Sequence, residues 1–187
     1  MSFADKISVL RILFIPIFIF LLFYFNTQHL YLKYPIILIF ILAMLTDFFD
    51  GLVARLKKEK SEIGKIIDPL ADKLLLFTSF ILIYALRDTL PLKFKLPLAV
   101  VLIVTIRDII ILLGVAILHF LKIEIPIAPS IWGKLTTFFQ MLTILSILLD
   151  IPVIPPYIWT IAVFFTLISG AGYFIRGINA ISKVTEV

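Results

Sequence analysis

The sequence predicts an all-α integral membrane protein with six transmembrane helices. Of its 187 residues, 62% are hydrophobic, and the mean hydropathy of +1.17 is too high for an ordinary soluble core. The apolar residues form six long runs, which short polar or proline-containing links separate. Because lipid offers the backbone no hydrogen bonds, such runs must be helical. The length fits one domain over residues 1–187.

The first three spans follow from their flanking residues. Tyr31 and Tyr34 lie in the link after the first run, and tyrosine favours the membrane interface. A short charged link separates the second and third runs, which favours antiparallel helices. Pro69 lies near the start of the third span, where its missing amide costs little. The predicted spans are about 7–25, 35–55 and 65–86.

The last three spans contain polar and small residues that need explanation. Arg107 and Asp108 lie near the middle of the fourth span, and charges at that depth should face the interior of the helix bundle. A proline-rich link at 150–156 must lie outside the bilayer core. Gly170 and Gly172 in the sixth span would allow close helix contact. The predicted spans are about 96–121, 133–149 and 157–175.

The distribution of positive charge predicts the orientation in the membrane. Six spans place both termini on one side, and twelve of the 17 lysine and arginine residues lie on that side. The positive-inside rule therefore predicts cytoplasmic termini and a polar active-site cavity facing the cytoplasm, in a multi-pass protein of the cell membrane. The net charge of +5 does not indicate nucleic-acid binding, since the basic residues flank apolar spans as lipid headgroup anchors do.

Carboxylates gather at the end of the second span and the start of the third. Asp47 and Asp50 are three positions apart, and Asp68 and Asp72 are four apart, so each pair shares one face of a helix. Antiparallel helices would bring the two faces together. Acids in a membrane span are costly and usually serve a function. The alternative is that these carboxylates only pair with nearby lysines at the helix ends.

The residue types around the four carboxylates favour chemistry on phosphate. Four carboxylates in a confined site cannot all remain ionised without cations. No cysteine occurs in the chain, and neither histidine is near, so oxygen ligands would select Mg²⁺, Mn²⁺ or Ca²⁺. Two such ions roughly 3.5–4 Å apart form the usual clamp for displacement at phosphorus. The neighbouring small residues would admit a phosphate or nucleotide, and Arg55 could contact its oxygens.

These positions together form a recognisable motif. The pattern D-x2-D-G-x2-A-R-x8-G-x3-D-x3-D is matched without a gap by Asp47, Asp50, Gly51, Ala54, Arg55, Gly64, Asp68 and Asp72. It resembles the signature of the CDP-alcohol phosphatidyltransferases. The resemblance implies Mg²⁺-dependent transfer of a phosphatidyl group from CDP-diacylglycerol to an alcohol, with release of CMP, by an enzyme that is typically a homodimer.

The resemblance also implies roles for individual residues. It assigns Asp47, Asp50, Asp68 and Asp72 to two Mg²⁺ or Mn²⁺ ions, and Asp72 also to the general base that deprotonates the acceptor. From the residues alone, these roles cannot be divided among the four aspartates. The residues implied to bind the CDP group are Thr46, Gly51, Ala54, Arg55 and Gly64.

The acceptor is predicted from the fourth and fifth spans. A phosphorylated acceptor such as glycerol 3-phosphate needs cations beside the metal site, and Arg107 and Lys134 are the candidates. The stretch 133–140 resembles the G-K-x-K-T-x2-Q pattern of bacterial phosphatidylglycerophosphate synthases, although Thr136 stands where they have a second lysine. Arg107-Asp108 also resembles cardiolipin synthases of this family, whose acceptor is phosphatidylglycerol. Glycerol 3-phosphate is favoured, and the alternatives are phosphatidylglycerol or another alcohol acceptor of the same family.

Two functions from other classes remain open. A small cation transporter could use the same acids as an ion path, but that reading leaves Gly51, Ala54, Arg55 and Gly64 unexplained. A catalytically silent membrane scaffold would bind neither Mn²⁺ nor CDP tightly.

Overall fold

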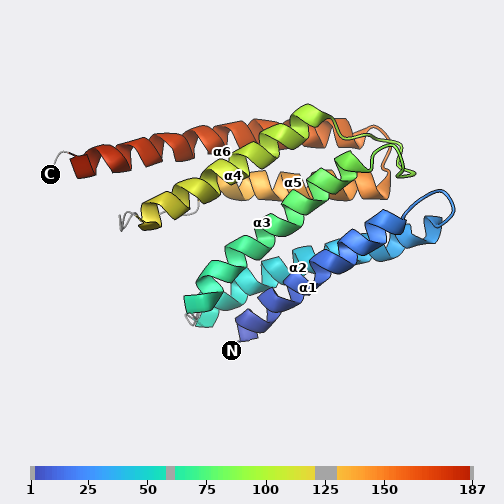
Figure 1. Ribbon diagram of the computed structural model, residues 1–187, viewed down its shortest axis with the longest axis horizontal. Helices are drawn as coiled ribbons and strands as arrows, with labels where there is room; N and C mark the ends of the chain where they lie inside the picture. Colours follow the sequence, from blue (N-terminus) through green and yellow to red (C-terminus); the bar gives the residue numbers. More distant parts are fainter. Residues whose placement is uncertain (1–2, 58–61, 121–129, 186–187) are drawn as a thin grey trace. The chain divides into compact units, whose positions relative to one another are not determined.

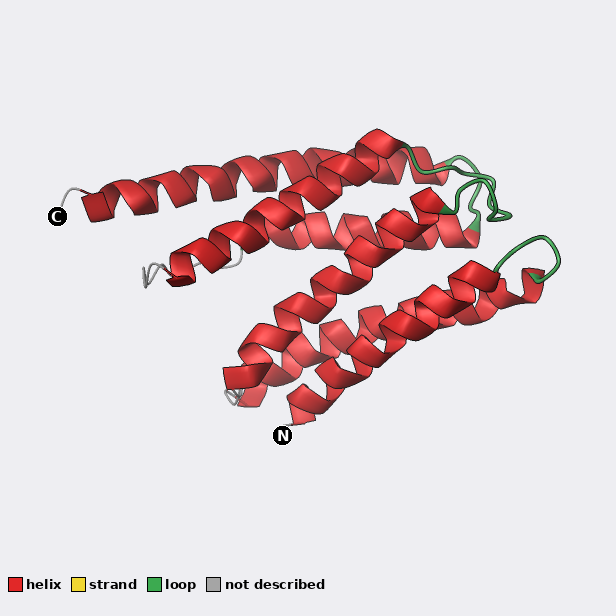
Figure 2. Ribbon diagram, in the orientation of Figure 1, coloured by secondary structure: helices red, strands yellow, loops and turns green. Residues whose placement is uncertain are grey.

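The computed structural model describes the backbone of residues 3–57, 62–120 and 130–185, and the side chains of residues 12–46, 73–114 and 130–177. The described residues form helices joined by loops and turns, and they contain no strand (Figure 2). Among these described residues, six α-helices follow one another (Figure 1), together with one short 3-10 helix, η1. Their bounds are α1 Phe3–Tyr24, η1 Leu30–Leu32, α2 Lys33–Lys57, α3 Glu62–Ala85, α4 Leu98–Phe120, α5 Ile131–Leu149 and α6 Ile154–Thr185.

The helices agree with the sequence-based spans in number and order. The predicted all-α class is therefore confirmed. The largest difference is at α6, which continues past the predicted end at 175 to Thr185. Within the described residues, two helical segments are long and apolar enough to cross a membrane, Ile131–Leu149 and Ile154–Gly177. Shorter apolar stretches occupy Ile12–Tyr24, Leu30–Thr46 and Lys73–Ala85.

The chain divides into two compact units. The first unit comprises Met1–Leu96 and Ile144–Ile151, and the second comprises Pro97–Thr143 and Pro152–Val187. In the first unit α1 packs against both α2 and α3. The Phe18 and Phe40 rings meet at the contact between α1 and α2, with centroids 5.8 Å apart. Buried apolar residues recur four and three positions apart on these helices: Phe18, Leu22, Phe25, Ile36, Phe40, Ala43, Leu76, Phe80 and Ile83.

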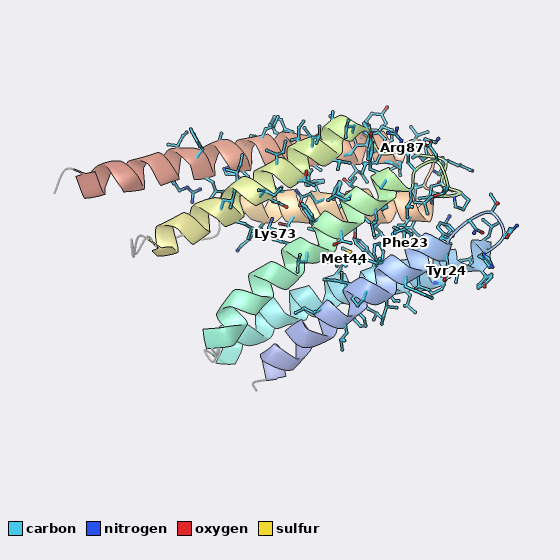
Figure 3. All side chains as sticks on the ribbon, viewed as in Figure 1. Phe23, Tyr24, Met44, Lys73 and Arg87 are labelled. Carbon is cyan, nitrogen blue, oxygen red and sulfur yellow. The ribbon has the colours of Figure 1, made fainter. Side chains whose placement is uncertain are left out.

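The opposite faces of the first unit's helices are also apolar. On α1, Leu13, Ile17 and Phe20 are about half exposed, although they are large apolar side chains. Figure 3 draws the described side chains as sticks, with Phe23 and Tyr24 at the end of α1 and Lys73 as the first described side chain of α3. A helix that is apolar on every side suits a lipid environment, where an exposed apolar surface costs nothing.

Asp150 joins three segments of the first unit. Its carboxylate accepts a hydrogen bond from the Lys93 backbone N–H at 2.9 Å and lies 3.8 Å from the Lys33 ammonium. Lys33 also donates to the Leu149 carbonyl at 3.4 Å. Asp150 has a φ of 60°, a left-handed conformation that aspartate and asparagine tolerate better than other non-glycine residues. The end of α5 is thus fastened to the start of α2 and to the link before α4.

Asp150→Ala should lower the thermal stability of the protein in detergent. The substitution removes an exposed hydrogen bond and an ion pair, a loss of about 1 kcal/mol. Asp150→Asn, which keeps an acceptor for Lys93 and tolerates the positive φ, should lose clearly less. Equal melting temperatures for Asp150→Ala and the wild type would show that the contact contributes nothing.

A second polar cluster occupies the link after α3. The Arg87 guanidinium lies over the Tyr84 ring, 4.3 Å from its centroid. Lys95 donates to the Asp88 carboxylate at 2.6 Å, and this hydrogen bond and the ammonium charge hold the pKa of Asp88 below its usual value. These groups are exposed, so the cluster contributes little to stability. It provides useful control positions outside the motif.

Candidate active site

The acidic motif spans two helices of the first unit. Its first half lies on α2 and its second half begins α3, so both halves are helical, as predicted. Four residues, 58–61, separate the two helices along the chain, which keeps the end of α2 within about 18 Å of the start of α3 (Figure 1). The helical backbone makes Asp47 and Asp50 neighbours on α2, and Asp68 and Asp72 neighbours on α3.

Among the residues predicted to bind metal or the CDP group, side-chain geometry is described for only one. Thr46 is partly buried, and its hydroxyl donates to the Ala43 carbonyl at 2.8 Å, a bond within its own helix. The remaining predicted residues lie outside the described side chains: Asp47, Asp50, Gly51, Ala54, Arg55, Gly64, Asp68 and Asp72. Among the side chains that are described, no three His, Cys, Asp or Glu gather as a metal site would require. The donor set of four carboxylates fits Mg²⁺ or Mn²⁺ by its chemistry.

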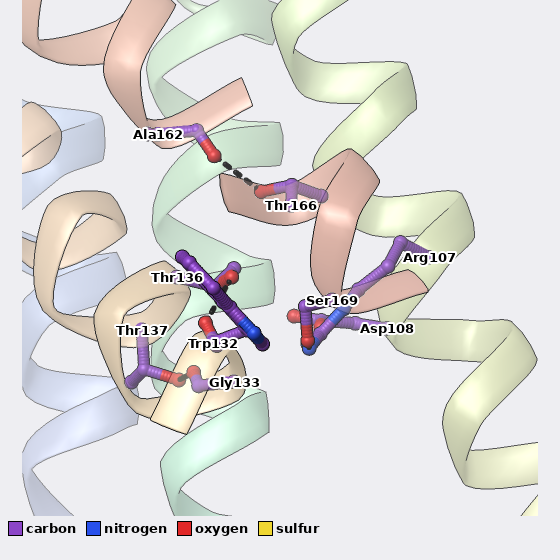
Figure 4. A network of polar contacts seen from close by, with 9 residues as sticks. All are labelled: Arg107, Asp108, Trp132, Gly133, Thr136, Thr137, Ala162, Thr166 and Ser169. Atoms are coloured by element: carbon purple, nitrogen blue, oxygen red, sulfur yellow. Dashed lines mark hydrogen bonds and ion pairs between the residues drawn. The ribbon is translucent and has the colours of Figure 1, made fainter. Parts of the chain in front are cut away.

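A buried basic cluster lies in the second unit, where α4 packs against α6. Arg107 on α4 is only 8% exposed, and Asp108 is 3% exposed. The Arg107 Nη1 donates to the Asp108 carboxylate at 2.6 Å, and Nη2 donates to the Ser169 hydroxyl on α6 (Figure 4). Both charges are therefore buried within the second unit, as predicted from the sequence.

The start of α5 completes the surroundings of this arginine. A Cβ atom added at Gly133 would lie 3.7 Å from the Arg107 Nη2 and 3.6 Å from the Ser169 hydroxyl. A Cβ at Gly170 on α6 would lie 3.4 Å from the Arg107 Cγ. The Trp132 and Phe139 rings of α5 stack on Phe165 of α6, with centroids 6.0 and 5.2 Å apart. Small residues thus admit the arginine, and aromatic rings hold the two helices beside it.

Two arginines share one aromatic ring at this site. The guanidinium carbons of Arg107 and Arg176 lie 5.7 and 5.5 Å from the centroid of the Tyr173 ring. Such cation–π contacts leave the N–H groups at the edges of each guanidinium able to donate. Arg176 is exposed, whereas Arg107 is buried. The structure thus adds a second cation next to a residue that the sequence had singled out.

Lys134 does not lie at the Arg107 guanidinium, although the preceding residue, Gly133, does. It follows Gly133, which lies at the Arg107 guanidinium, and it belongs to the same unit as Arg107. Its own side chain is exposed, because consecutive positions on a helix do not face the same way. The structure therefore brings Gly133, Ser169, Tyr173 and Arg176 to Arg107, and it leaves Lys134 at the surface of α5.

Two buried polar groups in the second unit have no partner among the described residues. They are the Arg107 Nε and the side-chain amide of Gln140, which is fully buried on α5. The nearby hydroxyls of Thr136 and Thr166 are satisfied by carbonyls of their own helices, at 2.8 and 2.6 Å. A buried polar group without a partner is rare in a native protein, and it often marks the place of a water or ligand.

Sequence reasoning missed Ser169, Tyr173 and Arg176. Their spacing of four and three positions places them on one face of α6, but the same spacing is typical of ordinary helix packing. Arg176 ends the predicted sixth span, which is also the usual place of a headgroup anchor. The only signal was a serine next to Gly170 in an apolar run, and its partner Arg107 lies 62 positions away.

The chain belongs to the CDP-alcohol phosphatidyltransferase family, whose model matches residues 1–168. It is thus an enzyme that transfers phosphatidyl groups. The matched region contains the whole acidic motif, Arg107 and Lys134, and it ends just before Ser169.

Three curated bacterial relatives illustrate the similarity. The chain is 31% identical over 188 residues to the "Probable phosphatidylglycerophosphate synthase" of Mycobacterium tuberculosis H37Rv, covering 98% of this chain and 85% of the relative. Two relatives are named CDP-diacylglycerol--glycerol-3-phosphate 3-phosphatidyltransferase. That of Aquifex aeolicus is 34% identical over 149 residues, covering 79% of this chain and 75% of its own. That of Bacillus subtilis is 31% identical over 194 residues, covering 95% of each chain.

Proposed function

We propose that this enzyme transfers the phosphatidyl group of CDP-diacylglycerol to glycerol 3-phosphate. The products are phosphatidylglycerophosphate, a precursor in phospholipid biosynthesis, and CMP. The complete acidic motif across α2 and α3 carries this proposal. The names of the Aquifex aeolicus and Bacillus subtilis relatives support the choice of glycerol 3-phosphate.

The acidic motif supplies the metal and donor sites in this proposal. Asp47, Asp50, Asp68 and Asp72 would hold two Mg²⁺ or Mn²⁺ ions. Such ions, when bound, neutralise charge on the pyrophosphate and on the departing CMP. The residues proposed to bind the CDP group are Thr46, Gly51, Ala54, Arg55 and Gly64. The small residues allow close approach to the helix backbone, and Arg55 donates to phosphate oxygens.

Asp72 is the proposed general base. It accepts the proton of an acceptor hydroxyl while that oxygen attacks the phosphorus of the phosphatidyl group. The new P–O bond forms as the bond from this phosphorus to the oxygen of CMP breaks. CMP leaves with that oxygen and its electron pair, so the charges and atoms balance without any covalent intermediate on the protein.

Arg107 and Lys134 are proposed to bind the phosphate of the acceptor. The burial of Arg107 supports this role, because a guanidinium bonds phosphate more strongly where water is scarce. Its unpartnered Nε can donate to a phosphate oxygen. Arg176, which also contacts the Tyr173 ring, adds positive charge near Arg107. The exposed Lys134 would contribute attraction at longer range.

The proposed setting is the cell membrane, with six spans, cytoplasmic termini and an active site that faces the cytoplasm. The lysine and arginine distribution supports this orientation. It also matches the chemistry, since nucleotide-linked and phosphorylated substrates are used on that side. We further propose a homodimer, on the strength of the family resemblance alone.

The proposed function is tested with purified protein in detergent. CDP-diacylglycerol and Mg²⁺ are supplied with glycerol 3-phosphate in one reaction and phosphatidylglycerol in another, and CMP and lipid products are followed. Phosphatidylglycerophosphate in the first reaction is the expected result. Cardiolipin in the second reaction alone would keep the metal chemistry and overturn the acceptor. No CMP with either acceptor would contradict the whole proposal.

A further inference from the structure

The Arg107 guanidinium is held by partners on two helices. Nη1 donates to Asp108, its neighbour on α4, at 2.6 Å, while Nη2 donates to Ser169 on α6. The Nε has no partner among the described residues, although it is buried. Both Nη atoms are therefore held within the protein, and the Nε is the guanidinium nitrogen that remains available to another molecule.

Packing also restricts this arginine. The Tyr173 ring covers the guanidinium, and Gly133 and Gly170 border it at positions where a Cβ would already be in contact. A side chain so enclosed cannot easily adopt another rotamer. Ser169 therefore determines where the guanidinium lies with respect to α6.

A purely structural tie between α4 and α6 explains these contacts less well. Such a tie has no need of a buried donor without a partner, which costs free energy in the folded state. The Ser169 oxygen accepts from Arg107 and keeps its own O–H as a donor, as any serine hydroxyl can. The Arg107 Nε–H and the Ser169 O–H can thus both donate to an anion that enters the cluster.

We propose that Ser169 is a positioning residue for the acceptor. It holds Arg107 so that the Nε–H is directed to the phosphate of the acceptor. This inference rests on the proposed function, because it takes the acceptor to be a phosphate monoester. It extends the site past the region that the family model matches, which ends at residue 168.

Variants of Ser169 test the inference through the two Michaelis constants. Ser169→Ala should raise the KM for glycerol 3-phosphate about tenfold, the effect of one hydrogen bond to a charged group. The KM for CDP-diacylglycerol should stay unchanged, because Ser169 acts only through Arg107. Ser169→Cys, which fills the same space with a poor acceptor, should behave like Ser169→Ala. Ser169→Thr, which keeps the hydroxyl, should restore the wild-type constant.

Thr166→Val is the matched control. Thr166 is one turn earlier on α6 and equally buried, but its hydroxyl donates to the Ala162 carbonyl instead of contacting Arg107 (Figure 4). Its removal should leave the KM for glycerol 3-phosphate unchanged. A normal KM in both Ser169→Ala and Ser169→Cys would overturn the inference, as would a parallel change in both constants together with a lower melting temperature. A wild type that makes no phosphatidylglycerophosphate would instead overturn the proposed function itself.

Discussion

Asp68→Asn is expected to abolish CMP release. An amide cannot replace the charge of a carboxylate in a site that holds divalent ions, and metal assistance at phosphorus is worth several kcal/mol, or about a thousandfold in rate. Asp72→Asn should lose about 10²–10⁴-fold through the missing general base alone. The measurement is CMP release from CDP-diacylglycerol with glycerol 3-phosphate, using purified variants in detergent.

Two controls separate this result from a loss of folding. Asp88→Asn changes an exposed aspartate outside the motif, paired with Lys95, and should retain wild-type CMP release. Removing divalent ions from the wild type with a chelator should stop the reaction, and added Mg²⁺ should restore it. CMP release by Asp68→Asn at the wild-type rate would contradict the proposal that the motif binds metal. Ion flux in liposomes without consumption of CDP-diacylglycerol would favour a transporter.

The double variant Arg107→Gln with Asp108→Asn should raise the KM for glycerol 3-phosphate by about two orders of magnitude. It removes a buried guanidinium from the phosphate, and losing one partner of a buried charge pair costs about 2–5 kcal/mol. The two charges are removed together because Arg107→Gln alone breaks a buried ion pair with Asp108, which would destabilise the fold. The KM for CDP-diacylglycerol should change little.

Lys134→Gln is compared with the Arg107 double variant in the same assay. Its side chain is exposed, so its loss should raise the KM for glycerol 3-phosphate far less than the loss of Arg107. The effect of Lys134→Gln should also diminish at high salt, whereas that of the Arg107 variant should persist. An unchanged KM in the Arg107 double variant, with a melting temperature near that of the wild type, would exclude Arg107 from the acceptor site.

Much of the fold could be read from hydropathy alone. The six predicted spans match the six helices in order, because an apolar run with polar ends can satisfy its backbone only as a helix. The end of α6 was the least predictable boundary. Polar residues after 175 marked the end of the apolar run, but backbone hydrogen bonds continue to Thr185 irrespective of side-chain polarity.

One part of the candidate site could be predicted from the local sequence, and another part could not. The acidic motif lies within one stretch of sequence, and its spacing becomes a common helix face once both halves are helical. The residues around Arg107 could not be predicted from local spacing. Ser169 and Tyr173 are far from it in sequence, and their apolar neighbours gave no reason to prefer them over any other residue of the sixth span.

The sequence by itself determined the helical class, the order of the helices, the motif and the family, since each depends on local spacing and composition. Only the tertiary structure decided which side chains surround Arg107. It buried the arginine against Ser169 and Tyr173 of α6, placed Gly133 of α5 beside it, and left Lys134 exposed. The physical reason is that helix packing brings together faces from distant parts of the chain, and apolar helices carry little sequence information about which faces will meet.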